Sequence, residues 1–417
     1  MDKPTNTPQR LRVLFVHNEY ILPGGEDEVV DREKRLLLEA GHEVSEYRRR
    51  NSEIERYGLL EKATLPFRTI WARDSCQELK FLMKSSKPDI VHFHNTFPLI
   101  SPATYYTCRR AGIPVIQSLY NPRLLCPAAT LYRDDRVCED CLGKTVPWPA
   151  VIHACYRSSC AQSAVASAML AVHRWIRTWE ELVDVYVAAT AFYRKKYITG
   201  GLPADRIIVK PHFVEPDPIP KEGLGDYALY IGRLTAEKGV PTLMRAWRGL
   251  NGIPLKIRGE GPLCEAVSRF SKSHPCTVHL LPRISRDELV SLFKGSRFLV
   301  WPSEGYYETL GLVAIESFAC GVPVIASDIG VMREIVEDGR TGLHFKSGYP
   351  IDLAAKVKWA WANPERMREM GVAARAEYEA KYTAEQNYRM LMEIYERALC
   401  ASKEVPPQAA KVVTARN

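Results

Sequence analysis

Residues 11–47 read LRVLFVHNEYILPGGEDEVVDREKRLLLEAGHEVSEY, and this stretch indicates the fold of the chain. The continuous apolar run 11–17 is typical of a strand buried in a parallel sheet. A glycine-containing loop at 23–25 follows, and residues 26–40 then repeat apolar side chains at helical spacing. Residues 43–47 predict the next strand. A strand–helix–strand unit of this kind indicates an α/β protein.

The same alternation continues along the chain. It predicts strands at 89–94, 114–119, 227–231, 255–258, 278–281, 298–301 and 322–326, with helices at 102–110 and 240–247 among them. Residues 210–225 hold four prolines and two glycines, which marks them as a linker between two halves. We therefore expect two doubly wound, Rossmann-like domains facing each other across a cleft. Ligands in such folds bind at the carboxyl ends of the strands.

The composition narrows the class of protein. The 417 residues are 46% hydrophobic and 25% charged, which excludes wholesale disorder. The net charge of +8 suits phosphorylated ligands or an anionic lipid surface and is weak evidence for nucleic acid, so no nucleic-acid partner is expected. No apolar run approaches the roughly 18 residues of a membrane span, and the polar start MDKPTNTPQR is no secretory signal. We expect a cytoplasmic protein.

Residues 302–327, PSEGYYETLGLVAIESFACGVPVIAS, carry two glutamates eight positions apart. With a helix beginning just after Glu308, its carboxylate and that of Glu316 would lie about 12 Å apart along the axis, roughly the reach of a sugar, pyrophosphate and ribose. Glu316 could accept both hydroxyls of a ribose, and Glu308 could orient a hexose. The free amides expected to face phosphate belong to Thr309, Leu310 and Gly311. The alternative is a pair of solvated glutamates on an amphipathic helix.

A second segment, YIGRLTAEKGV at 230–240, places Arg233 and Lys238 around a strand-to-helix turn. Two fixed cations there could neutralise a departing nucleoside diphosphate. No two aspartates in the sequence lie two residues apart, so the Asp-x-Asp metal clamp used by other sugar transferases is missing. We expect no catalytic metal at the diphosphate.

With the loop PGGEDE (23–28), the strand end HFHN (92–95) and RGEGP (258–262), these motifs resemble the retaining glycosyltransferases of family 4 over about residues 11–399. The resemblance implies the GT-B fold. It also implies transfer of a sugar from a UDP- or GDP-sugar, with retention at the anomeric carbon, in polysaccharide or glycolipid synthesis. The acceptor would be a glycan or a lipid-linked sugar.

The resemblance assigns roles to individual positions. Arg233 and Lys238 match the diphosphate cations, Glu316 the ribose ligand and Glu308 the residue at the donor sugar. The remaining donor contacts implied are Gly24 and Gly25 in the loop over the phosphates, Gly261 in RGEGP, and Arg283 near the base, beside Thr309, Leu310 and Gly311.

One position departs from the family. The strand 114–119 is commonly followed by a histidine beside the donor sugar, and here Tyr120 stands there, followed by Asn121. A tyrosine, with a reference pKa of about 10, is a poor base near neutral pH. His94, at another strand end, is a further catalytic candidate from the acceptor side, or a hydrogen-bonded structural residue.

The domain boundaries expected from this resemblance are 1–215 for the acceptor side, with an insertion at about 124–160, and 216–385 for the donor side. Residues 386–400 would form a helix that packs back on the first domain. Residues 401–417 would be a disordered tail.

The insertion contains Cys126, Cys138, Cys141 and Cys155, with Cys160 in reserve. The C-x2-C step suits tetrahedral zinc, and the insertion has little apolar core without it. We expect a structural zinc site; free thiols, iron–sulfur ligation and a nucleic-acid knuckle are the alternatives. The odd total of 11 cysteines argues against a disulfide framework.

Residues 51–86 mix cations with large apolar side chains. They predict either an amphipathic arm that touches an anionic membrane on its inner face or helices packed on their own domain. Two other functions stay open for the whole chain: a nucleotide-sugar epimerase or hydrolase, and an inactive binding protein of the same fold. A phosphorylase would need a pyridoxal-phosphate lysine, for which the sequence has no strong signal.

Overall fold

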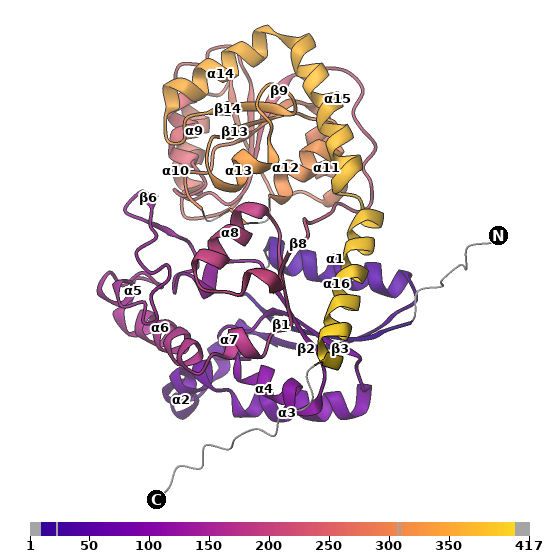
Figure 1. The fold of residues 1–417 in the computed structure, drawn as a ribbon. Coiled ribbons are helices and arrows are strands. Elements are labelled where there is room, and N and C mark those ends of the chain that lie inside the picture. Colours follow the sequence, from indigo (N-terminus) through magenta and orange to yellow (C-terminus); the bar gives the residue numbers. More distant parts are fainter. Residues whose placement is uncertain (1–9, 22–23, 307, 310, 405–417) are drawn as a thin grey trace, which may run out of the picture.

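The computed structural model describes residues 10–404 except 22–23, 307 and 310. They form two Rossmann-like domains, each built on a six-stranded sheet whose strands are all parallel (Figure 1). The first sheet has the order β2-β1-β3-β4-β7-β8: β2 (Glu43–Arg50), β1 (Arg12–Glu19), β3 (Ile90–Asn95), β4 (Val115–Leu119), β7 (Val185–Ala188) and β8 (Ile207–Val209). The prediction of two doubly wound domains is confirmed.

The second sheet repeats this architecture in the order β11-β10-β9-β12-β13-β14. Its strands are β11 (Val278–Leu281), β10 (Leu255–Arg258), β9 (Tyr227–Ile231), β12 (Ser296–Trp301), β13 (Val324–Ser327) and β14 (Gly342–Phe345). Most of these strands are rich in apolar residues, and most of their side chains are buried or half-buried because helices cover both faces of a parallel sheet.

Helices connect the strands in both domains. In the first domain they are α1 (Gly25–Glu39), α2 (Leu59–Ile70), α3 (Arg73–Ser86), α4 (Ala103–Ala111), α5 (Pro149–Ile152), α6 (Cys160–Trp175), α7 (Thr178–Glu181) and α8 (Ala191–Thr199). In the second they are α9 (Val240–Trp247), α10 (Cys264–Ser273), α11 (Arg286–Gly295), α12 (Leu312–Ala319), α13 (Gly330–Ile335), α14 (Pro350–Ala362) and α15 (Pro364–Lys381). A small hairpin, β5 (Tyr132–Arg133) and β6 (Arg136–Val137), projects from the cysteine-rich insertion. Short 3-10 turns occur at Asn51–Arg56, Pro122–Leu124 and Ala204–Arg206.

The last helix, α16 (Ala384–Glu404), runs back from the second domain along the first (Figure 1). Its Leu391, Ile394 and Tyr395 are buried in one cluster with Phe15 and Ile90 of the first sheet. Burying an aliphatic side chain of this size contributes about 1.5–3 kcal/mol. The end of the chain therefore ties the second domain to the first.

One expectation is corrected in detail. The helix expected just after Glu308 begins only at Leu312, because Gly311 takes a left-handed backbone conformation (φ 63°) at its N-cap. The segment 51–86 forms α2 and α3, and α2 packs against α6 while α3 packs against α4. No helix in the described part of the chain combines the length and apolar character needed to cross a bilayer. The expected tail 401–417 lies largely outside the described residues.

Candidate active site

The strand ends of the second sheet present the predicted donor residues. Lys238 follows β9, Glu308 follows β12, and the two side chains form a mostly buried ion pair. The indole Nε1 of Trp301 donates to Glu308 Oε2 at 3.2 Å. Burial alone would raise the pKa of Glu308, but the charge and hydrogen bond of Lys238, together with the hydrogen bonds from Trp301 and the Gly311 amide, outweigh burial and hold the pKa below its usual value. Glu308 is therefore an ionised carboxylate held on a cation, which excludes the alternative of a solvated glutamate.

Glu316 lies on α12 and is bound by a residue of the other domain. Arg32 of α1 is fully buried and donates to Glu316 Oε1 at 3.0 Å, to Glu28, and to the carbonyl of Phe213 at 2.9 Å. Burial raises the pKa of Glu316, and the charge of Arg32 opposes this rise only in part. A further cation, Arg286 of α11, donates to Glu28 Oε1 at 2.7 Å. Two arginines and two glutamates thus join α1 to α11 and α12.

The loop that carries Glu308 also contacts the first domain. The hydroxyl of Thr309 donates to the carbonyl of Tyr120. The hydroxyl of Tyr193 on α8 donates to the carbonyl of Tyr306, and Tyr132 of the hairpin lies against Gly305. The 302–311 loop is therefore held by residues from three parts of the first domain.

The other predicted donor residues lie at several places in the fold. Arg233 is exposed in the turn after β9, and Arg283 follows β11. Gly261 has φ 152°, and a Cβ there would lie 2.6 Å from the Leu234 carbonyl oxygen, so it allows two loops to approach. Gly24 and Gly25 lie at the start of α1. Leu310 lies outside the described residues.

The two further catalytic candidates, Tyr120 and His94, are buried against each other. Their rings stack with centroids 5.7 Å apart, and Tyr120 Oη lies 3.0 Å from His94 Nδ1. Burial raises the pKa of Tyr120 well above its usual value and lowers that of His94 well below. Both groups are therefore neutral at ordinary pH and hydrogen-bond each other, while Nε2 of His94 has no hydrogen-bond partner among the described residues.

Behind this pair lies a buried group that could in principle bind a metal. Ligand atoms of Glu33, His92 and His94 lie within 4.8 Å of one another. However, Lys210 forms a buried ion pair with Glu33, and both ring nitrogens of His92 have hydroxyl partners. A divalent cation here would lie beside the positive charge of Lys210, and only the carboxylate of Glu33 would be present to balance both positive charges. Such an excess of buried positive charge is strongly unfavourable.

The predicted zinc ligands are gathered but not in metal-binding geometry. Burial, with the mutual influence of the four thiols, raises the pKa of Cys138, Cys141 and Cys155, and that of Cys141 reaches about 12. All four belong to one cluster, yet no three of the four described sulfurs lie within 4.8 Å of one another. Cys160 is exposed at the start of α6. The donor set suits zinc, and the sulfur positions do not form a closed site.

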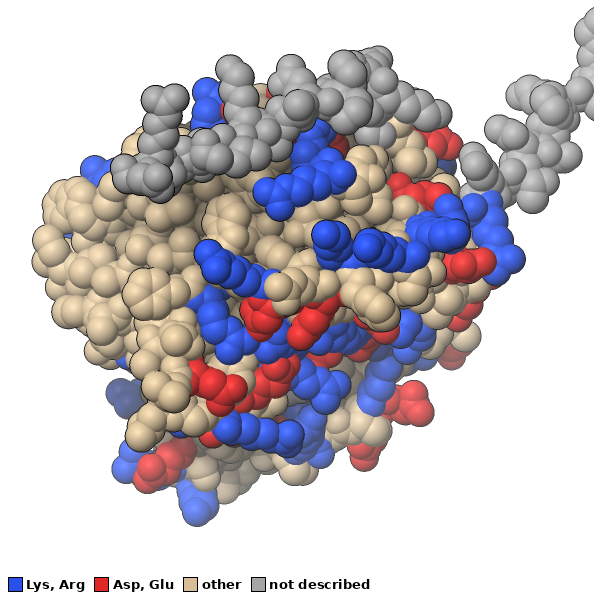
Figure 2. Space-filling view, turned by 90° about the horizontal axis from the view of Figure 1, so that it is seen from below, with Lys and Arg blue, Asp and Glu red and all other residues tan. Residues whose placement is uncertain are grey.

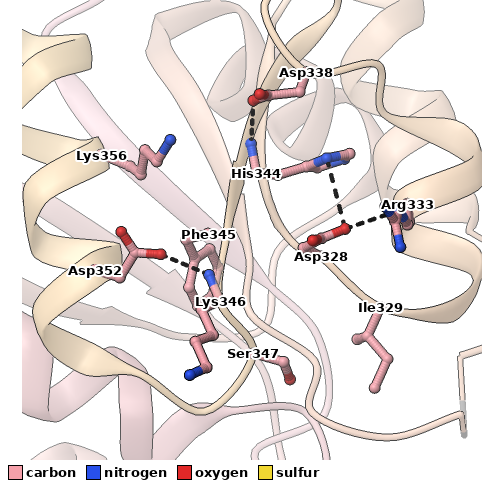
Figure 3. A pocket seen from close by; sticks show the side chains of 10 residues that line it. All are labelled: Asp328, Ile329, Arg333, Asp338, His344, Phe345, Lys346, Ser347, Asp352 and Lys356. Carbon is pink, nitrogen blue, oxygen red and sulfur yellow. Dashed lines mark hydrogen bonds and ion pairs between the residues drawn. The ribbon is translucent and has the colours of Figure 1, made fainter.

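A cavity of about 860 Å³ lies elsewhere, at the carboxyl ends of β13 and β14. Figure 3 shows that its carboxylates are engaged: Asp338 and Asp352 accept backbone amides of His344 and Lys346, and Asp328 pairs with an arginine of α13. None of the predicted donor residues lines it. This cavity is therefore separate from the Lys238–Glu308 and Arg32–Glu316 ion pairs.

Comparisons with known proteins agree with this geometry. The model of "Glycosyltransferase Family 4" matches residues 23–218, and that of "Glycosyl transferases group 1" matches 215–377. The two matches adjoin at the linker and together extend over most of the chain. The chain is a family 4 glycosyltransferase.

Curated relatives of this family 4 glycosyltransferase match it over part of their length. A D-rhamnosyltransferase of Pseudomonas aeruginosa is 31% identical over 39% of this chain and 44% of its own length. An alpha-maltose-1-phosphate synthase of Mycolicibacterium smegmatis is 28% identical over 54% and 66%. An uncharacterised glycosyltransferase of Methanocaldococcus jannaschii is 32% identical over 48% and 57%. The matches span between about two fifths and two thirds of these relatives.

Solved structures show the fold to be GT-B. Anabaena HepE in complex with UDP-glucose superposes with a TM-score of 0.66 at 13% identity, over 93% of this chain and all of the other. A sucrose-phosphate synthase of Thermosynechococcus elongatus gives 0.68 at 18% identity, over 94% and 100%.

Sequence reasoning missed two residues of the cleft, Arg32 and Glu26. Arg32 stands alone on the polar side of a predicted amphipathic helix, where an arginine is usually solvated. Glu26 is part of the quoted PGGEDE loop, but an acidic residue in a first helical turn is ordinary there. Its position directly after two glycines of a strand-end loop is the signal that could have identified it.

Proposed function

We propose that the chain transfers a sugar from a nucleotide sugar to a hydroxyl of a glycan or lipid-linked acceptor, with retention at the anomeric carbon. The observation that carries this is the Lys238–Glu308 pair at the ends of β9 and β12, followed by Glu316 on α12. Neighbours of the same fold crystallised with UDP and UDP-glucose support a UDP-sugar donor over a GDP-sugar. Residues 1–215 would bind the acceptor and 216–385 the donor.

In this reaction the bond from the anomeric carbon to the diphosphate oxygen breaks, and the electron pair leaves with the diphosphate. The acceptor oxygen attacks from the same face. Lys238 and Arg233 are placed in the turn where the growing negative charge would lie, and each such contact typically accounts for 10²–10³ in rate. Because protein cations fill this role, transfer needs no divalent metal at the diphosphate.

A thermal-shift panel of UDP, GDP, ADP and their sugars tests donor binding, since a ligand at a hundred times its dissociation constant stabilises by about 2.7 kcal/mol. The accepted donor is then incubated with glycan and lipid-linked acceptors, and products are separated by mass spectrometry. An acceptor-linked sugar supports the proposal. Free nucleoside diphosphate with no linked product, or an epimerised donor, would instead establish the hydrolase or epimerase. If no nucleotide binds, the proposed transferase function is wrong, and the chain is instead a binding protein for another class of ligand.

We further propose that Cys126, Cys138, Cys141 and Cys155 hold one structural zinc ion. Tetrahedral Zn–S bonds of about 2.3 Å would bring the sulfurs to about 3.8 Å from one another, so metal binding would tighten the insertion. Arg133 and Arg174 lie close enough to influence the pKa values of the cluster, and their charge would favour thiolates. Elemental analysis of protein purified without added metal tests this.

The lower face of the first domain supports peripheral membrane contact of an otherwise cytoplasmic protein. Leu59, Leu60 and Phe67 of α2 are 75–89% exposed, as are Phe81 of α3 (75%) and Trp175 of α6 (82%). Figure 2 shows on this face a broad area with few charged side chains beside a region where Lys and Arg are interspersed with Asp and Glu. Exposed apolar side chains flanked by cations suit an anionic bilayer. Flotation with phosphatidylglycerol vesicles, lost in Phe67→Ser and at high salt, would support it; equal binding to neutral vesicles would not.

A further inference from the structure

The position of the family histidine is occupied by Tyr120, which is buried and neutral, so it cannot take a proton from an acceptor hydroxyl. Its partner His94 is buried behind it and likewise neutral. The turn 120–121 nevertheless lies at the contact between the two domains, because the Tyr120 carbonyl accepts the hydroxyl of Thr309, the residue after Glu308. Any group that replaces the histidine has to lie beside this turn.

Glu26 lies there. It belongs to the first turn of α1, directly after the two glycines, and it is only 7% exposed. Its Oε2 accepts from Asn121 Nδ2 at 3.1 Å, so the carboxyl is tied to the same turn that contacts the Glu308 loop. Its Oε1 has no hydrogen-bond partner among the described residues. A buried carboxylate oxygen without a partner is costly, which points to a ligand group that supplies one.

Neighbours on every side set the ionisation of Glu26. Burial raises its pKa to about 7, against the opposing effects of His17 and Asn121. Three charged or titratable groups act on the pKa of Glu26: His17 of β1, Asp27 of α1 and Arg123 after β4. Glu26 in turn raises the pKa of two tyrosines, Tyr120 after β4 and Tyr197 of α8. The adjacent Asp27 is in contrast fully engaged, with His17 Nε2 at 2.8 Å and the Gly24 amide at 2.8 Å. Of the two acidic residues, only Glu26 is suited to exchange a proton near neutral pH.

We infer that Glu26 is the proton acceptor for the attacking hydroxyl of the acceptor. The acceptor oxygen forms its bond to the anomeric carbon while its proton passes to Oε1 of Glu26, and the diphosphate departs with the electron pair of the broken bond. The proton later leaves to solvent. This role rests on the proposed function and is additional to the donor contacts.

The test compares Glu26→Gln with wild type on the donor and acceptor identified above. Glutamine keeps the size of the side chain and an oxygen for Asn121, but it cannot accept the proton. We expect kcat to fall about 10²–10⁴-fold, the usual contribution of a general base, with the donor's KM and its thermal shift unchanged. Wild-type kcat should decline below about pH 7, where the carboxyl is protonated, and this acid limb should be absent from the variant.

Asp31→Asn is the matched control, because Asp31 is an exposed carboxylate of the same helix that pairs with Arg48 at the surface. It should retain the wild-type kcat and pH profile. A Glu26→Gln enzyme with normal kcat, or one whose acid limb persists, would overturn the inference while leaving sugar transfer intact. A loss seen only as a raised KM would assign Glu26 to binding and would equally overturn it. If wild type transfers no sugar, the proposed function fails, and with it the basis of this test.

Discussion

Replacing Arg32 by methionine tests the connection between the domains. The guanidinium is fully buried and holds Glu316, Glu28 and the Phe213 carbonyl together. Removing one partner of a buried ion pair typically costs 3–5 kcal/mol, because the other charge stays buried without compensation. The side chain of Glu316 is 19% exposed and that of Glu28 is 45% exposed, so we expect the lower end, about 3 kcal/mol. For a domain of roughly 200 residues this lowers the melting temperature by about 6–12 °C.

Arg286→Met is the matched control, because Arg286 contacts the same oxygen of Glu28 but is 38% exposed. An exposed pair of this kind contributes about 0.2–1 kcal/mol. The double variant Arg32→Met with Glu316→Gln removes both charges and should recover more than half of the loss in a double-mutant cycle. Thermal unfolding, followed by tryptophan fluorescence and calorimetry, is measured for five ligand-free proteins: wild type, Arg32→Met, Arg286→Met, Glu316→Gln and the double variant.

The loss of stability caused by Arg32→Met should also depend on pH. The pKa of Glu316 in the folded protein is already raised by burial, and the loss of Arg32 raises it further. A carboxyl whose pKa is higher in the folded than in the unfolded state contributes stability below its unfolded pKa and loses it as pH rises through the folded pKa. The difference in melting temperature between wild type and Arg32→Met should therefore be larger at pH 8 than at pH 5. A melting temperature within about 2 °C of wild type, or a deficit independent of pH, would refute the reasoning.

Three further predictions follow from the site. Because Lys238 and Arg233 are placed to offset the diphosphate charge, mild chelation should leave transfer intact; activity lost in chelator and restored by Mn²⁺ or Mg²⁺ would contradict this. Glu308→Gln should lower kcat about 10²–10³-fold, whereas Glu316→Gln should mainly raise the donor's KM, since ribose contacts do not change during reaction; steady-state kinetics with near-normal constants for both variants would reject the assignment. Cys141→Ser should remove the bound metal and lower the melting temperature, with exposed Cys276→Ser as the unaffected control; metal content unchanged in Cys141→Ser would count against the site.

Local patterns predicted most strands because these are short, largely apolar runs between polar loops, whereas β7, β8 and β14 were not predicted. The strands at 227–231, 255–258 and 278–281 and the helix at 240–247 have the predicted bounds. The start of α12 could not be derived in the same way. Residues 302–327 continue an amphipathic pattern through Gly311, and only the left-handed conformation of that glycine, packed against Ile335, delays the helix. The periodicity of apolar residues in a sequence does not reveal the tertiary contacts that fix the backbone conformation of a single residue.

The site was predictable where one segment carries the chemistry and unpredictable where two segments share it. Glu308, Glu316 and Lys238 stand in motifs of fixed spacing, so their proximity to one strand edge follows from the parallel sheet. The partner of Glu316 is 284 positions away on α1, and nothing near Arg32 in the sequence distinguishes it from a solvated arginine. Such a contact requires the relative placement of two domains.

The pairing of charges in the cleft has a consequence for donor binding. Each acidic residue of the E-x7-E segment is already neutralised by the protein, Glu308 by Lys238 and Glu316 by Arg32. Under the proposed function an arriving diphosphate competes with Glu308 for Lys238. The loss of the Lys238–Glu308 ion pair therefore offsets part of the favourable interaction between Lys238 and the diphosphate. Glu308, still held by Trp301, is then released toward the hydroxyls of the donor sugar. Lys238 therefore influences both the affinity for the donor and the position of the Glu308 carboxylate beside the donor sugar. A substitution of Lys238 should alter both together.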